Sequence, residues 1–160
     1  MSHVSYDRGD TMIAGVRSIY SDVTAALRAH ASSGHALVAM GHAYMVGGQL
    51  SDLSERRVLG GNQHAIPVDI FADDLAYVAL GHLHRAQRVG GRAGVRYSGS
   101  PIPLALDENT YAHQSLIATI PDEGPTEVET VRAPRHIDII RLPGRAGGPQ
   151  PDLAAAGSSK

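Results

Sequence analysis

The chain has 160 residues, of which 42% are hydrophobic and 19% charged, and its formal net charge is −2. This length suits one domain with a packed core. The charge balance argues against a broad basic surface that would bind nucleic acid by charge alone. Because cysteine is absent, disulfides, thiolate zinc sites and a cysteine nucleophile are excluded. The polar N-terminus is unlike a signal peptide and no apolar run is long enough for a membrane span, so we expect a cytoplasmic protein without membrane association.

The first half of the chain predicts one helix and two short strands. A helix over residues 12–30, with Asp10 or Thr11 as its cap, follows from apolar residues at helical spacing. The side of this helix that we expect to face the core carries Ile13, Val16, Ile19, Tyr20, Val23, Ala26 and Leu27. Residues 35–40 form a short apolar strand, and residues 76–80 form a buried strand.

The second half predicts mainly antiparallel strands. The expected strands are, in chain order, 86–89, 95–98, 113–120, 126–133 and 136–142. The first two flank a glycine-rich turn as a hairpin, and residues 99–104 form a rigid loop. Residues 144–160 have low complexity and are expected to be disordered. The fold class is therefore α/β, or α+β, with a strand-rich second half.

Two of the predicted strands run into the dipeptide Gly-His, at His42 and His82, and His84 follows the second. Since adjacent parallel strands end at the same rim of a sheet, where sites form, we expect these strands to be parallel neighbours. The glycines would let the chain turn sharply and let a ligand approach closely. Neutral imidazole binds manganese, iron or zinc well. The alternative is that these are polar residues at strand ends, and we expect the other histidines, such as His113, to be surface or half-buried residues.

Three stretches make a family resemblance specific. ALVAMGHAYMVGG, AYVALGHLHRAQRVGG and VRYSGSPIPLALDE resemble the later motifs of the SbcD nuclease subunits, within the calcineurin-like metallophosphoesterase superfamily. The resemblance covers roughly residues 35–142. It implies that residues 1–143 are part of a metallophosphoesterase β-sandwich flanked by helices, and that residues 144–160 are a tail outside this domain.

The resemblance also implies a site and its chemistry. The family uses two manganese ions to activate water for phosphodiester cleavage in DNA. By position, His42 and His82 would bind one Mn²⁺ and His84 the other. Arg85 would lie near a substrate phosphate or make a structural ion pair, and the segment Ser98–Pro101 would buttress the metal loop. The implied activities are double-strand exonuclease and single-strand endonuclease, and the implied partners are DNA, an SbcC-type ATPase subunit and a second copy of the complete protein.

The chain departs from the family in the first three motifs. D-x-H, G-D-x-x-D and G-N-H followed by an acid do not occur; Asp7 and Asp10 match none of them, and GNQH at residues 61–64 comes in the wrong order. These motifs supply the bridging aspartate and a catalytic histidine. We therefore assign no catalytic residue, expect the sequence to represent the C-terminal half of the phosphoesterase domain, and expect it to be inactive by itself. Two alternatives stay open: another metallophosphoesterase acting on a small phosphoester, and a non-catalytic remnant or interaction module.

Overall fold

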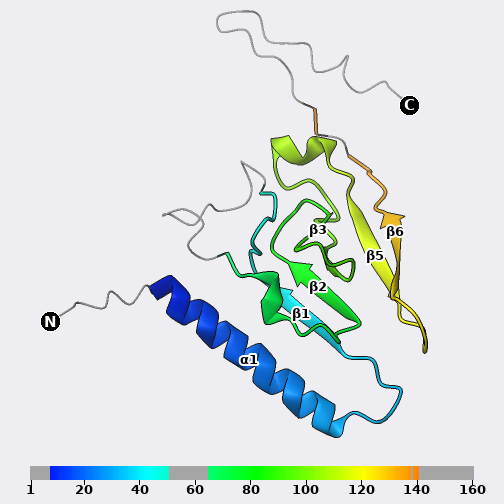
Figure 1. Ribbon diagram of the computed structural model, residues 1–160. Helices are drawn as coiled ribbons and strands as arrows, with labels where there is room; N and C mark the ends of the chain where they lie inside the picture. Colours follow the sequence, from blue (N-terminus) through cyan, green and yellow to red (C-terminus); the bar gives the residue numbers. More distant parts are fainter. Residues whose placement is uncertain (1–7, 51–64, 138, 141–160) are drawn as a thin grey trace, which may run out of the picture.

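The computed structural model describes residues 8–50, 65–137, 139 and 140, which form a mixed α/β structure with one long helix and two sheets (Figure 1). The helix and strands are α1 (Arg8–His30), β1 (Val38–His42), β2 (Tyr77–Gly81), β3 (Gln87–Arg88), β4 (Val95–Tyr97), β5 (Gln114–Thr119) and β6 (Glu127–Arg132). Two 3₁₀ helices, η1 (Val68–Ile70) and η2 (Leu106–Thr110), were not predicted. Within the described ranges, no helix has the length and apolar character to cross a membrane.

The larger sheet has the strand order β1-β2-β4-β3. Strands β1 and β2 are parallel, and His42 lies opposite Gly81, which confirms the predicted parallel neighbours. The predicted hairpin is also present, as β3 pairs antiparallel with β4. The parallel pairing of β4 with β2 was not predicted. It arises because the chain first turns back through β3, so that β4 runs in the direction of β2.

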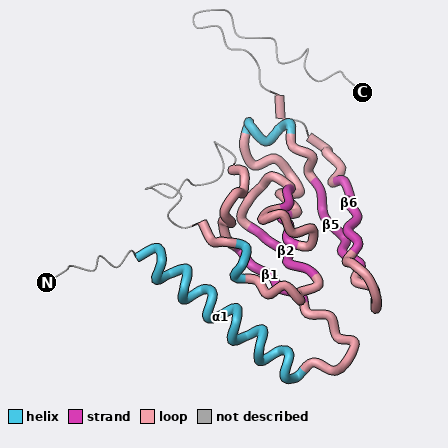
Figure 2. The backbone as a smooth tube through the Cα atoms, in the orientation of Figure 1, coloured by secondary structure: helices cyan, strands magenta, loops and turns pink. Residues whose placement is uncertain are grey.

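The second sheet is the antiparallel hairpin of β5 and β6, in which Gln114 lies opposite Arg132 (Figure 2). The Thr126 hydroxyl donates to the Ala76 carbonyl at 2.7 Å and so joins this hairpin to the start of β2. The strand predicted over 136–142 is wrong where it is described, since residues 136, 137, 139 and 140 form none. Its remaining residues and the predicted tail at 144–160 lie outside the described residues.

The core is centred on β2 and β4. Val78, Leu80, Val95 and Tyr97 are each no more than 5% exposed, because both strands have neighbours on either side. The edge strand β1 differs, since its residues are exposed or half-buried and Met40 is 78% exposed. The apolar strand predicted at residues 35–40 is present, but it runs from Val38 to His42 and lies at the edge of the sheet.

Helix α1 begins at Arg8, before the predicted residue 12, so Asp10 and Thr11 lie inside the helix and not at its cap position. The predicted apolar face is only partly correct. Val16 and Tyr20 pack against the core and Thr24 is buried, whereas three predicted core residues are largely exposed: Ile19, Val23 and Leu27. The reason is that α1 meets the body along a narrow line, mainly through the segment around η1.

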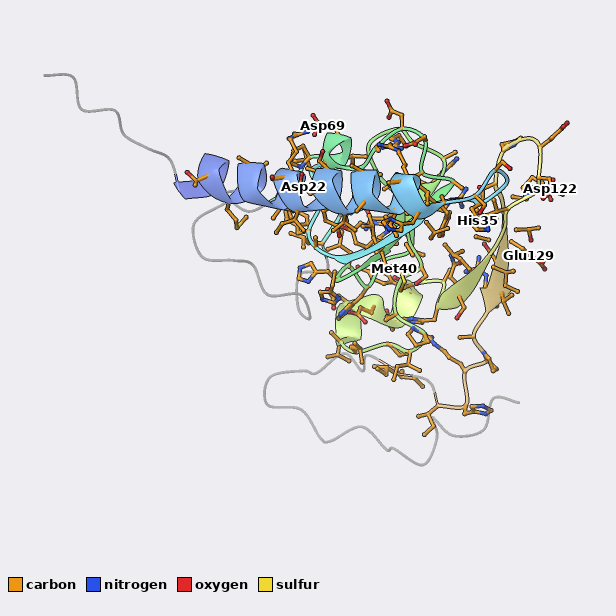
Figure 3. All side chains as sticks on the ribbon, turned by 90° about the horizontal axis from the view of Figure 1, so that it is seen from below. Asp22, His35, Met40, Asp69, Asp122 and Glu129 are labelled. Atoms are coloured by element: carbon orange, nitrogen blue, oxygen red, sulfur yellow. The ribbon has the colours of Figure 1, made fainter. Side chains whose placement is uncertain are left out.

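Polar contacts hold α1 in place along its length. Arg17 pairs with Asp69, beside the helix in Figure 3, at 2.8 Å, and Arg28 Nε donates to Asp74 at 2.7 Å. Between them, the Tyr20 hydroxyl donates to the carbonyl of Met40 at 3.0 Å. These contacts hold the helix beside β1, the strand that ends at His42.

Candidate metal centre

The ends of β1 and β2 bring two histidines together at one rim of the sheet. His42 is the last residue of β1 and lies opposite Gly81, and His82 follows at once. The two imidazole rings are 5.4 Å apart between centroids and nearly perpendicular, at 78°. Metal–nitrogen bonds of about 2.0–2.1 Å place two rings on one ion roughly 5 Å apart. The separation is therefore suited to one shared ion.

Gly81 makes this approach possible. A Cβ atom added to Gly81 would lie 2.9 Å from Nδ1 of His42, too close for a real side chain. The group that comes close to Gly81 is the His42 ring, and the expected close approach of a ligand stays a prediction. The expected turn at glycine is wrong, because the positive φ at this strand end belongs to His82.

His82 adopts a backbone conformation that side chains rarely take, with φ at 107°. Such a conformation costs on the order of 1–3 kcal/mol and persists only where surrounding contacts impose it. Here the Gly81 carbonyl accepts the Ala43 amide at 3.2 Å, and the next side chain, Leu83, is 2% exposed. Since strained residues gather at functional sites, this geometry favours a functional role for His82.

His84 is oriented by a buried carboxylate. Its Nδ1 lies 2.7 Å from Oε1 of Glu108, whose side chain is fully buried. We assign the proton of the neutral ring to Nδ1, which donates to this carboxylate. In this tautomer the electron pair is on Nε2, as in histidines that bind metals.

Glu108 is itself held from several sides. Its Oε2 accepts the Leu104 amide at 2.7 Å, and its carbonyl oxygen lies 3.1 Å from Nε2 of His113. His113 is 6% exposed, so the expectation of a surface or half-buried residue is wrong there, and its Nδ1 lies 2.9 Å from the Ser100 carbonyl oxygen. Glu108 was missed as a functional residue, although it closes the third stretch of the family resemblance.

The segment Ser98–Pro101 supports the loop that carries His84, as predicted. The Ser100 amide donates to the His84 carbonyl at 2.9 Å. A Cβ on Gly99 would lie 2.7 Å from the same oxygen, and the φ of Gly99 is +83°. Only glycine fits this close approach and this conformation.

Two further residues that were not predicted join the loops around the site. The hydroxyl of Tyr97, which is 1% exposed, donates to the Ala43 carbonyl at 2.5 Å and accepts the Met45 amide at 3.0 Å. Gln87 accepts the Gln49 amide at 2.8 Å. Both contacts tie the chain after His42 to the β3–β4 hairpin, and so fix the rim.

Arg85 is exposed and follows His84 directly. Its guanidinium carbon lies 5.9 Å from the centre of the Tyr111 ring, within the range of a cation–π contact. Within the described residues it forms no ion pair with a carboxylate, so the structural ion pair that the sequence left open is not seen there.

The donors at this rim fit only part of a two-metal centre. No three histidine, aspartate or glutamate side chains come together as a metal site in the parts of the chain that the structure describes. The His42 and His82 rings lie next to each other, and His84 follows two residues after His82. The carboxylates that would bridge two ions are missing among the described residues. Asp7 and His64 lie outside the described residues, and no side-chain position is described for Asp10.

No family model matches the chain. It is similar to the curated SbcD subunit of the SbcCD nuclease of Rhodobacter capsulatus, with 41% identity over 145 residues, 89% of this chain and 34% of the relative. The corresponding protein of Escherichia coli K12 is 40% identical over 100 residues, 61% of this chain and 24% of the relative. That of Bacillus subtilis is 36% identical over 116 residues, 72% of this chain and 28% of the relative.

The chain thus spans between about a quarter and a third of the length of these curated relatives. The longest match includes the stretches that carry the histidines, since it takes in 89% of the chain. The resemblance found in the sequence is confirmed: the chain is related to part of the SbcD subunit of the SbcCD nuclease.

Proposed function

We propose that the chain is part of an SbcD-type nuclease that hydrolyses phosphodiester bonds in DNA, as a double-strand exonuclease and single-strand endonuclease. The observation that carries this proposal is the rim itself. Two paired parallel strands bring the ring centroids of His42 and His82 to 5.4 Å from each other, and the buried Glu108 orients the His84 ring. The names of the relatives, all nucleases, supply the reaction class.

At this rim, His42 and His82 would hold one Mn²⁺ and His84 the second, with carboxylates from outside the described residues. The bound ions would supply a water molecule activated for attack on phosphorus. The chain's own contribution is positional. Glu108 keeps the proton of His84 on Nδ1, and Gly81 leaves room for the His42 ring. In the complete protein the two sheets would be layers of the phosphoesterase sandwich.

The relatives are named as subunits of an SbcCD nuclease, so we extend the proposal to assembly. The complete protein would act in the cytoplasm with an SbcC-type ATPase subunit, and as a homodimer. The alternative of a small-phosphoester hydrolase has less support, because the matched relatives share the nuclease name. The remnant alternative makes a different prediction, since a remnant would not bind metal at the rim.

Manganese titration tests the site directly. The purified chain should bind Mn²⁺, followed by electron paramagnetic resonance, and each of His42→Ala, His82→Ala and His84→Ala should weaken binding. His136→Ala, at an exposed position outside the proposed ligand set, is the matched control. Binding that is equal in all four variants and the original chain would support the remnant.

Cleavage provides the second test. With linear duplex or single-stranded DNA and Mn²⁺, we expect negligible cleavage by the chain alone, because the bridging carboxylate and catalytic histidine of the family motifs are absent from its sequence. Fusion to a polypeptide carrying the three missing motifs should restore cleavage, and His84→Ala should abolish it. Robust cleavage by the chain alone would overturn the expected inactivity.

A further inference from the structure

A polar cavity of about 500 Å³ lies between the loop after His84, the end of η2 and the β5–β6 hairpin. Among the described residues, its polar lining consists of Arg85, Thr110, Tyr111, Gln114 and Arg132 and includes no carboxylate. The cavity begins one residue beyond His84. It therefore lies beside the candidate metal centre without sharing any of its proposed ligands.

The strand register points Arg132 to this cavity. Arg132 lies opposite Gln114 across the hairpin and donates from Nη1 to its Oε1 at 2.8 Å. Side chains alternate between the two faces of a strand, so Glu127 and Glu129 fall on the opposite face of β6. The negative charges of this strand thus do not line the cavity that contains the Arg132 guanidinium.

Two positive charges, from Arg85 and Arg132, therefore line one cavity in which the described part of the chain places no carboxylate. Within the described residues neither forms an ion pair, and their contacts are with the Tyr111 ring and the Gln114 amide oxygen. Three of the other described arginines, Arg17, Arg28 and Arg92, do pair with carboxylates. Like charges gathered in this way favour the binding of an anion.

We propose that this cavity binds a phosphate of a nucleic-acid strand beside the phosphodiester at the metal rim. Guanidinium groups match phosphate oxygens in geometry and charge, and amide and hydroxyl donors such as those of Gln114 and Thr110 add to them. The inference rests on the proposed nuclease function for the source of the phosphate. Such a contact positions the strand and carries no sequence preference.

Binding of a labelled single-stranded oligonucleotide to the 160-residue chain in EDTA tests this proposal. Arg132→Gln and Arg85→Gln should each weaken binding roughly fivefold to tenfold and lower the slope of log affinity against log salt by about 0.7. Arg88→Gln is the matched control, since it removes one exposed charge on β3 outside the cavity lining. Arg132→Lys, which keeps the charge, should retain part of the affinity.

Equal weakening by Arg132→Gln and Arg88→Gln would overturn the proposal, once equal melting temperatures show that both variants fold. Inorganic phosphate at the same phosphate concentration should compete poorly with the oligonucleotide; effective competition would assign the cavity to free phosphate.

The outcome is separable from that of the metal site, because EDTA removes manganese from the binding assay. If Arg132→Gln weakens DNA binding but the chain binds no Mn²⁺, only the proposed metal site fails. If the chain binds Mn²⁺ but its DNA affinity does not depend on Arg132, only the cavity proposal fails.

Discussion

The strands that end at Gly41-His42 and at Gly81-His82 carry the same dipeptide in very different surroundings. Strand β2 lies between β1 and β4, and Val78 and Leu80 are 1% and 5% exposed. Strand β1 lies at the sheet edge, where Met40 is 78% exposed. At the end of β1 the histidine is still part of the strand, whereas after β2 it adopts a positive φ.

This difference shows which strand end positions the other. The end of β2 is anchored by the core, which can therefore impose strain on His82. The end of β1 depends on its register with β2 and on the Tyr97 hydroxyl, which bonds the Ala43 carbonyl at 2.5 Å. His42 is thus placed by its neighbours, and we expect changes in β2 to disturb the whole rim.

The largest expected effect is on the free energy of unfolding, when a buried side chain of β2 and an exposed side chain of β1 are each truncated. Leu80→Ala should lower the free energy of unfolding by about 2–5 kcal/mol, because it leaves a cavity in the core. Met40→Ala, on the exposed edge strand, should change it by less than about 0.5 kcal/mol. Urea unfolding of both variants measures the contrast. An equally large loss for Met40→Ala would show that β1 is covered in solution.

A smaller effect should follow removal of the carboxylate behind His84. Glu108→Ala leaves the Leu104 amide unsatisfied and should destabilise the chain by about 1–3 kcal/mol. If His84 binds metal, it should also weaken manganese binding about 10- to 100-fold, as expected for loss of the orienting partner. Glu123→Ala, at an exposed turn position, serves as the control. Unchanged manganese binding in Glu108→Ala would separate Glu108 from the metal site.

Glycine substitutions at the two strand ends should have opposite signs. At His82, where φ is 107°, glycine relieves strain, so His82→Gly should be more stable than His82→Ala by about 1 kcal/mol. At His42, within a strand, His42→Gly should be less stable than His42→Ala by roughly 0.5–1 kcal/mol. Thermal unfolding of the four variants tests this. The same sign at both positions would contradict the strained backbone.

The smallest effect concerns the helix beside β1. The hydrogen bond from Arg28 lowers the pKa of Asp74 below its ordinary value of 3.8. A lowered folded-state pKa stabilises the fold above the unfolded value, and this contribution disappears as the pH falls through the folded value. Asp74→Asn should therefore be slightly less stable than the original chain at about pH 6, and the difference should vanish at strongly acidic pH. Asp122→Asn controls for loss of one exposed charge, and a difference that grew on acidification would contradict this sign.

Long-range geometry limited what the sequence could predict about the site. His42, His82 and His84 could be identified because each follows an apolar strand in a distinctive dipeptide. Glu108 could not be assigned its role, because it reaches His84 across 24 residues through a 3₁₀ helix that no periodicity indicated. The strain at His82 was equally hidden, since a glycine stands next to it.

The sequence by itself determined the long helix, most of the strands and the β3–β4 hairpin, because period and turn residues act locally, and the repeated Gly-His dipeptide predicted the parallel pairing of its two strands. The tertiary structure alone decided that β1 lies at the edge, that only a narrow line of α1 is buried, and that two arginines share a cavity. These features depend on which surfaces pack together. Packing is set by the whole chain at once, so no local pattern contains it.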